Sequence, residues 1–182
     1  MNQSRIIFLT LAIGLAFSAA AIAGGMTKDE YSAAKRTIEA DYKSAKTTCE
    51  PMTGNAKDVC NAEAKGRERV ALAELDATNK PSDRARYEAR LAKANAAYDV
   101  AKEKCDDQAG NAKDVCMKEA KAAHVTAKAD AKSHKKIVAA NKDAAADKRD
   151  AEYAVAKEKC DALAGTPKDT CMADAKARYG KS

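Results

Sequence analysis

Apolar positions between residues 81 and 109 alternate steps of four and three residues. This spacing places them on one face of a helix and is the heptad pattern of coiled coils. The positions are Tyr87, Leu91, Ala94, Tyr98, Ala101 and Cys105. A second seam of this kind, between residues 27 and 50, consists of Ile38, Tyr42, Ala45 and Cys49. Both segments are therefore predicted to be amphipathic helices that bury one narrow stripe.

The remaining helices are predicted from their end signals. Thr27 and Glu30 form a capping box, so the first helix begins there and ends near Glu50. The second and fourth helices should follow Asn55 and Asn111, whose side chains are good N-caps. The fifth should follow Thr166, with Pro167 in its first turn, and end near Tyr179.

One unit recurs three times along the chain. The stretches CEPMTGNAKDVC, CDDQAGNAKDVC and CDALAGTPKDTC run over residues 49–60, 105–116 and 160–171. Tyrosines precede them at positions 42, 98 and 153, so the copies follow one another at nearly equal intervals. Beyond residues 1–23, the chain is predicted to be a single elongated helical domain, residues 24–182. Its three repeats cover about 27–80, 81–136 and 137–182.

Each repeated stretch indicates a tight helical hairpin closed by a disulfide. A glycine in each, Gly54, Gly110 or Gly165, suits a left-handed residue between two helices. The cysteines lie at equal distances before and after this junction, so hairpin closure brings them to the same height. We therefore predict three local disulfides rather than unpaired thiols or a thiolate metal site. They are Cys49 with Cys60, Cys105 with Cys116, and Cys160 with Cys171.

The sequence is compatible with two arrangements of the helices. The segment Asn79-Lys80-Pro81-Ser82 is the strong breaker between repeats, and Asn141 marks a weaker one. If Pro81 only kinks the chain, residues 56–109 form one rod antiparallel to the fourth helix. If Pro81 and Asn141 are both full turns, three short hairpins stack. Either way the fold is all-α, coiled-coil-like and built from antiparallel helices.

Residues 1–23 have the features of a secretory signal peptide. Arg5 precedes the apolar core, residues 6–20, and Ala21-Ile22-Ala23 provides a small-x-small site with cleavage after Ala23. Export to an oxidising compartment agrees with six paired cysteines. Removing Arg5 lowers the net charge from +6 to +5. The mature chain has few large aliphatic residues but is rich in alanine, lysine and glutamate, so its predicted core is thin.

Candidate chemistry is sparse. His124 and His134 have no carboxylate or nucleophile placed against them by any motif, and we expect solvated surface histidines. We expect no enzyme, no catalytic residue, no cofactor and no metal site. The basic cluster KSHKK, with Lys132, Lys135 and Lys136, suggests weak binding to anionic surfaces. No aromatic platform accompanies it, so nucleic acid is not an expected partner.

Three features of the sequence resemble a known group of proteins. They are the predicted signal peptide, the cysteine-bounded GNAKDVC repeats, and the runs Glu63-Ala64-Lys65 and Glu119-Ala120-Lys121. The whole chain resembles small exported proteins of Gram-negative bacteria that are often described as TolA-like. In composition it is also similar to the long periplasmic helical region of TolA. The resemblance implies a location in the cell envelope and no particular activity.

These observations predict a non-enzymatic periplasmic protein of the cell envelope that acts as a helical scaffold or interaction module. Its partner, a protein or another envelope component, and its oligomeric state are left open. The alternative is a binding or stress-protective protein that engages anionic envelope surfaces or metal ions.

Overall fold

Five α-helices make up the fold in the computed structural model, which describes residues 25–181. They are α1 (Lys28–Cys49), α2 (Gly54–Asn79), α3 (Asp83–Cys105), α4 (Gly110–Asp161) and α5 (Thr166–Tyr179). No strand occurs within this range. The predicted all-α class is confirmed. The predicted signal segment, residues 1–23, lies outside the described residues.

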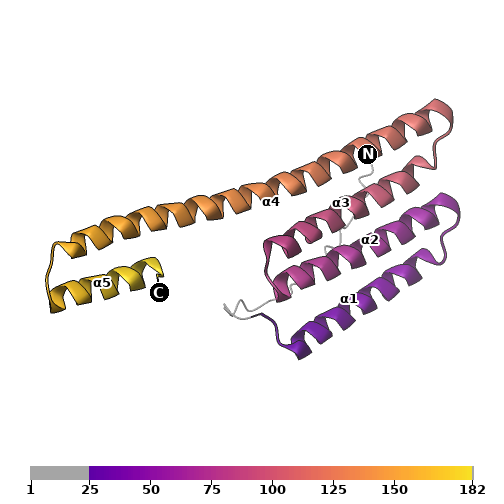
Figure 1. Cartoon of the computed structure of the whole chain (residues 1–182). Helices are drawn as coiled ribbons and strands as arrows, with labels where there is room; N and C mark the ends of the chain where they lie inside the picture. Colours follow the sequence, from indigo (N-terminus) through magenta and orange to yellow (C-terminus); the bar gives the residue numbers. More distant parts are fainter. Residues whose placement is uncertain (1–24, 182) are drawn as a thin grey trace, which may run out of the picture.

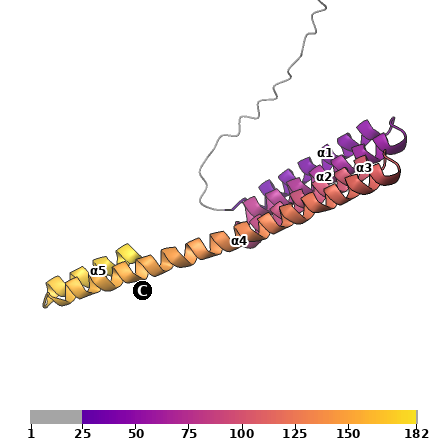
Figure 2. The same cartoon turned by 90° about the horizontal axis from the view of Figure 1, so that it is seen from above.

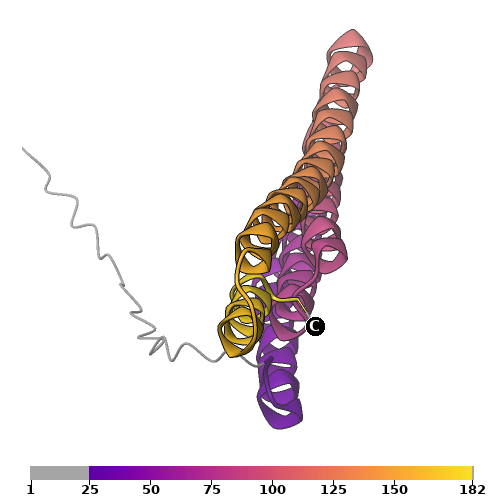
Figure 3. The ribbon, with the colours of Figure 1, turned by 60° about the vertical axis from the view of Figure 1, so that its left-hand side comes forward.

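The helices follow one another as an antiparallel layer. The helix α1 packs against α2, α2 against α3, and α3 against α4, and the four succeed each other in chain order (Figures 1 and 3). The 52-residue α4 is much longer than its neighbour, and its second half runs beyond the layer. There α5 folds back along it, as Figure 2 shows from above. The molecule is therefore a four-helix layer with a two-helix arm.

Local signals at the helix ends explain where three of these elements begin or end. The Thr27 hydroxyl accepts a hydrogen bond from the Glu30 N–H at 3.2 Å, and the Glu30 carboxylate accepts one from the Thr27 N–H at 2.8 Å. This is the predicted capping box. The Ser82 hydroxyl accepts from the Ala85 N–H at 3.0 Å and starts α3. Gly180, in the left-handed conformation, ends α5.

The two breakers left open by the sequence behave differently. Residues 80–82 form a full turn, so α2 and α3 are antiparallel neighbours. At Asn141 the helix continues without interruption. The physical difference is Pro81, which has no N–H to donate within a helix and disfavours a helical conformation at the preceding residue. Asn141 keeps its N–H, so nothing forces α4 to end. The structure thus combines features of the two assemblies.

The core consists of cysteine and alanine rather than of large aliphatic side chains. Cys49, Cys105 and Cys160 are the largest side chains with almost no exposure, at 0%, 1% and 1%. Gly66 is buried as well, and so are seven more hydrophobic residues, six of them alanines: Ala64, Leu75, Ala89, Ala94, Ala120, Ala131 and Ala175. Alanine allows helices to approach closely but contributes little burial, at about 25 cal/mol per Å² of apolar surface. The disulfides therefore add covalent links within the three hairpins, joining α1 to α2, α3 to α4 and α4 to α5. The helices α2 and α3 are held together by packing and ion pairs instead.

An ionic contact marks the point where α4 leaves α3. The Lys142 ammonium lies 2.5 Å from the Asp83 carboxylate, which also accepts from Arg86 at 3.1 Å. The hydrogen bond from Lys142, and then that from Arg86, lowers the pKa of Asp83 below its ordinary value of 3.8. The stabilisation from this carboxylate is therefore fully present above that ordinary value and is lost as the pH falls through the folded-state pKa.

We expect Asp83→Asn to lower the melting temperature slightly at neutral pH and to leave it unchanged at a pH well below the ordinary pKa of an aspartate. Circular dichroism melts of both proteins at the two pH values measure this. The site is exposed, so the effect should also shrink at high salt. An equal deficit at both pH values would show that the carboxylate charge is not the cause.

Candidate functional site

Three disulfides close the three repeated hairpins in the predicted pairing. They join Cys49 to Cys60, Cys105 to Cys116, and Cys160 to Cys171. Each pair has a Cα–Cα distance of 5.6 Å, within the usual range for a disulfide. The hairpin symmetry inferred from the sequence is confirmed. The near-identical geometry makes each hairpin a copy of one stapled unit.

The predicted capping role of the asparagines at two of these junctions is wrong. The helices α2 and α4 already begin at Gly54 and Gly110, and neither Asn55 nor Asn111 lies at an N-cap. The glycines have φ of +58° and +56°, a conformation in which a Cβ would be strained. Inside the first turn, Asn55 is free to reach across to α3. Its side-chain amide donates to the carbonyl of Glu103 at 2.7 Å.

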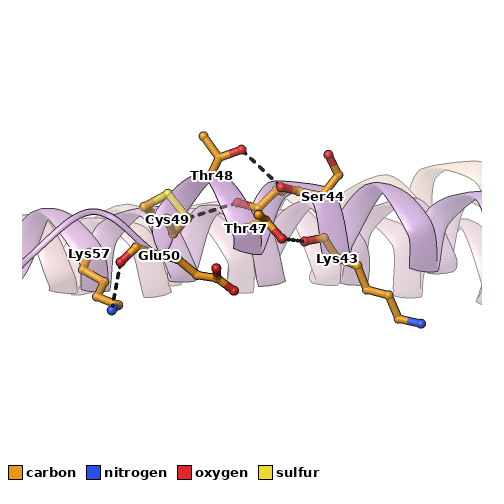
Figure 4. The surroundings of a disulfide bond; sticks show 9 residues. Lys43, Ser44, Thr47, Thr48, Cys49, Glu50 and Lys57 are labelled. Atoms are coloured by element: carbon orange, nitrogen blue, oxygen red, sulfur yellow. Dashed lines mark hydrogen bonds between the residues drawn. A yellow bond between two sulfur atoms is a disulfide. The ribbon is translucent and has the colours of Figure 1, made fainter.

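A lysine in the first turn after each glycine crosses the hairpin loop. Lys57 donates to the Glu50 carbonyl at 3.3 Å, close to the first disulfide (Figure 4). In the second hairpin Lys113 lies 2.8 Å from the Asp106 carboxylate, and this hydrogen bond raises the pKa of Lys113. The third hairpin repeats the contact between Lys168 and Asp161 at 3.0 Å, which lowers the pKa of Asp161. The repeated lysine therefore supports the loop of each staple.

Both histidines of α4 contact α3. The His124 ring is half-buried: it stacks on Tyr98 with centroids 4.5 Å apart, and its Nε2 lies 2.7 Å from Asn95 Oδ1. His134 is exposed, as expected from the sequence, and its Nε2 lies 3.1 Å from the Arg90 guanidinium. The packing of His124 against Tyr98 was not predicted.

The basic cluster is partly engaged in the same interface. Lys132, Lys135 and Lys136 are all exposed on α4. The Lys135 ammonium lies 5.0 Å from the centre of the Tyr87 ring, which is a cation–π contact. Two of the three lysines named as surface-binding candidates are thus left for an external anion.

An apolar groove of about 560 Å³ lies between α2 and α3. Its apolar lining consists of Gly66, Val70, Ala71, Ala96, Ala97, Val100 and Ala101. Two ion pairs cross from α2 to α3 near this groove. They join Glu63 to Lys104 at 3.3 Å and Glu74 to Lys93 at 2.6 Å. The result is an apolar trough bordered by charges of both signs.

Gly66 marks a close approach of α2 and α3 beside this groove. A Cβ at this position would lie 3.0 Å from the Cβ of Ala96. The sequence alone did not predict the groove. The available signal was an isolated glycine inside a long helix, which often has a packing reason.

The described residues contain no group of three or more histidine, cysteine, aspartate or glutamate side chains arranged to hold a metal ion. Among the same residues, no helix combines the length and apolar character needed to cross a bilayer. The described residues therefore form a set of disulfide-linked helical hairpins with an apolar groove.

These features define a disulfide-stapled α-helical repeat protein. Comparison with protein-family models, with curated proteins and with solved structures found no match. The function is therefore inferred from the residues of this chain and their geometry.

Proposed function

We propose that this chain is a non-enzymatic scaffold or interaction protein of the bacterial periplasm. The observation that carries the proposal is the apolar groove formed where α2 and α3 pack against each other. Ligand-binding and partner-binding surfaces are typically apolar in the centre and polar at the edge, which is the arrangement of this groove.

The compartment is supported by cysteine chemistry. All six cysteines are paired, and disulfides persist in oxidising environments such as the periplasm. The predicted signal segment, residues 1–23, agrees with export. The disulfides add stability to a protein whose core contains few large side chains. They thereby help to keep the helices that form its binding surface in place.

The groove favours a partner that inserts apolar side chains between charged flanks. Val70 and Val100 supply its larger apolar contacts, while Glu63 and Lys104 stand at one end. An amphipathic helix of a second envelope protein has this complementary form, with an apolar stripe bordered by charges. The proposal therefore predicts recognition of a helical protein segment.

A photoreactive amino acid at Ala97, an exposed groove position, should crosslink to one discrete partner in living cells. The matched control carries the same amino acid at Arg36, which is exposed on α1. Adding Val100→Glu should remove the Ala97 adduct, because it places a charge in the apolar groove. Identical adducts from both positions, or an Ala97 adduct that survives Val100→Glu, would refute the groove as the binding site.

A further inference from the structure

Within residues 25–181, one continuous face of α4 is left without a partner. Its α3-facing stripe contains the buried residues Ala120 and Ala131. A second stripe, spaced three, four or seven residues apart, is exposed along both halves of the helix. It consists of Ala122, Val125, Ala129, Ser133, Ala140, Ala144, Asp147, Ala151 and Ala154. The spacing keeps all of these residues on one side of the helix.

The internal repeat indicates what should cover this stripe. The first half of α4 corresponds to α2, because Cys116 takes the place of Cys60 in the repeated unit. The second half corresponds to α3, because Cys160 takes the place of Cys105. The helices α2 and α3 pack on each other because the chain turns at Pro81. The two halves of α4 belong to one uninterrupted helix and cannot meet in the same way.

The contact between α2 and α3 uses positions whose counterparts on α4 are exposed. Gly66 meets Ala96, and the counterparts of these residues are Ala122 and Ala151. Both counterparts are small, as close helix approach requires. Val100 of the groove corresponds to Val155, which is 56% exposed. The exposed stripe of α4 therefore corresponds to the surfaces that α2 and α3 pack against each other, but on α4 no second helix covers it within the described residues.

We infer that a second copy of this chain covers the stripe, with the two α4 helices antiparallel. The first half of each α4 then lies against the second half of the other, and the two-fold axis passes near residues 138 and 139. Each half of α4 thereby gains the neighbour that its counterpart has inside the first two repeats. This inference goes beyond the proposed function and does not depend on the groove.

Charge complementarity supports this register. The pair Glu63–Lys104 corresponds to Glu119 and Lys159. The pair Glu74–Lys93 in the same way corresponds to Asp130 and Lys148. Both counterpart pairs keep the acid on the first half of α4 and the base on the second half. A two-fold dimer contains each pair twice, so four interchain ion pairs are expected.

The third ion pair between α2 and α3 has uncharged residues at the corresponding positions of α4. Arg69 and Asp99, 2.6 Å apart, correspond to Val125 and Ala154. Val125 is 58% exposed in the single chain, and Ile137, near the proposed two-fold axis, is 55% exposed. Pairing along α4 removes such apolar side chains from water, which favours association. From position 119 to 159 the contact is about 60 Å long, at about 1.5 Å per residue.

The resulting assembly has a defined architecture. Each end of the dimer is a layer of six helices: α1, α2, α3 and the first half of α4 from one copy, then the second half of α4 and α5 from the other. All three repeats then have the neighbour relations seen between the first two. The interface is isologous, so it closes at two copies and does not propagate into fibres.

Two charge-reversal variants test the register. Variant A carries Glu119→Lys and Asp130→Lys, and variant B carries Lys148→Glu and Lys159→Glu. Each alone places like charges opposite each other at all four ion-pair positions, so analytical ultracentrifugation should find wild-type dimers but monomers of A and of B. Mixing A with B restores all four ion pairs, and the mixture should sediment as a heterodimer.

A matched control carries Arg36→Glu and Lys43→Glu, which gives the same charge change as B on exposed residues of α1. It should remain dimeric. All positions reversed in A and B are exposed, so circular dichroism should show unchanged helix content. Monomeric wild-type protein would overturn the inference, and so would dimers of A or B alone. A mixture of A and B that stays monomeric while the wild type is dimeric would overturn it too, because the two α4 helices would then not pair in this register.

Discussion

Replacing Cys160 and Cys171 with alanine is expected to lower the free energy of unfolding of the third hairpin by about 3 kcal/mol, as chain entropy predicts for a loop of this size. The helix α5 packs only against α4 within the described residues, and it has 14 residues. An isolated helix of that length is marginal in water. Without the staple, α5 should therefore detach and fray.

Hydrogen exchange followed by mass spectrometry measures this directly. Protection should be lost over residues 166–179 and retained over residues 28–105. The contacts that remain include the buried Ala175, the Lys168–Asp161 pair, an ion pair of Lys181, just beyond α5, with Asp150, and the Tyr153 and Tyr179 rings 6.2 Å apart. The matched control removes Cys49 and Cys60 instead. The 22-residue α1 packs along α2 and should keep more of its protection. Equal protection of α5 in the variant and in the wild type would contradict the role given to the staple.

Gly66→Leu is expected to destabilise the protein by about 2 kcal/mol, the usual cost of forcing extra atoms into a packed contact. A Cβ alone at this position comes within 3.0 Å of the Ala96 Cβ and 3.6 Å of its Cα. The rest of a leucine side chain must separate α2 from α3 or occupy the groove. The same variant should therefore lose the crosslink from Ala97.

Urea unfolding followed by circular dichroism gives the stability change. Gly66→Ala provides the graded control, because its tight Cβ contact is offset by about 1 kcal/mol of improved helix propensity. Ala40→Leu adds comparable bulk at an exposed position of α1 and should cost almost nothing. A Gly66→Leu protein as stable as the wild type would show that α2 and α3 do not approach as closely as described.

The stapled hairpins were predictable because their signals are local. The equal placement of Cys105 and Cys116 around the Gly110–Asn111 junction depends only on helix geometry, and the structure confirms that pairing. The Thr27 capping box is equally local and is also confirmed. The role of Asn55 was predicted wrongly because the helix begins two positions earlier than expected, at Gly54, which moves the amide from the cap to a contact with α3.

The groove and the behaviour of α4 depend on contacts between distant segments. Whether Gly66 is a weak point or a packing site depends on Ala96 of the next helix, which composition does not reveal. At Asn141 the local signal is too weak to decide between a turn and a helix. The contact of Lys142 with Asp83 joins residues 59 positions apart, so it depends on the packing of α4 against α3 and has no local signal.

Three local disulfides hold three copies of one hairpin. Peptide mapping without reductant checks this pairing, on protein whose thiols are blocked by alkylation at the moment of cell lysis. Three linked peptides are expected, Cys49 with Cys60, Cys105 with Cys116 and Cys160 with Cys171, and no alkylated cysteine. A dominant peptide that links different hairpins, such as Cys60 with Cys160, or a large alkylated fraction, would contradict it.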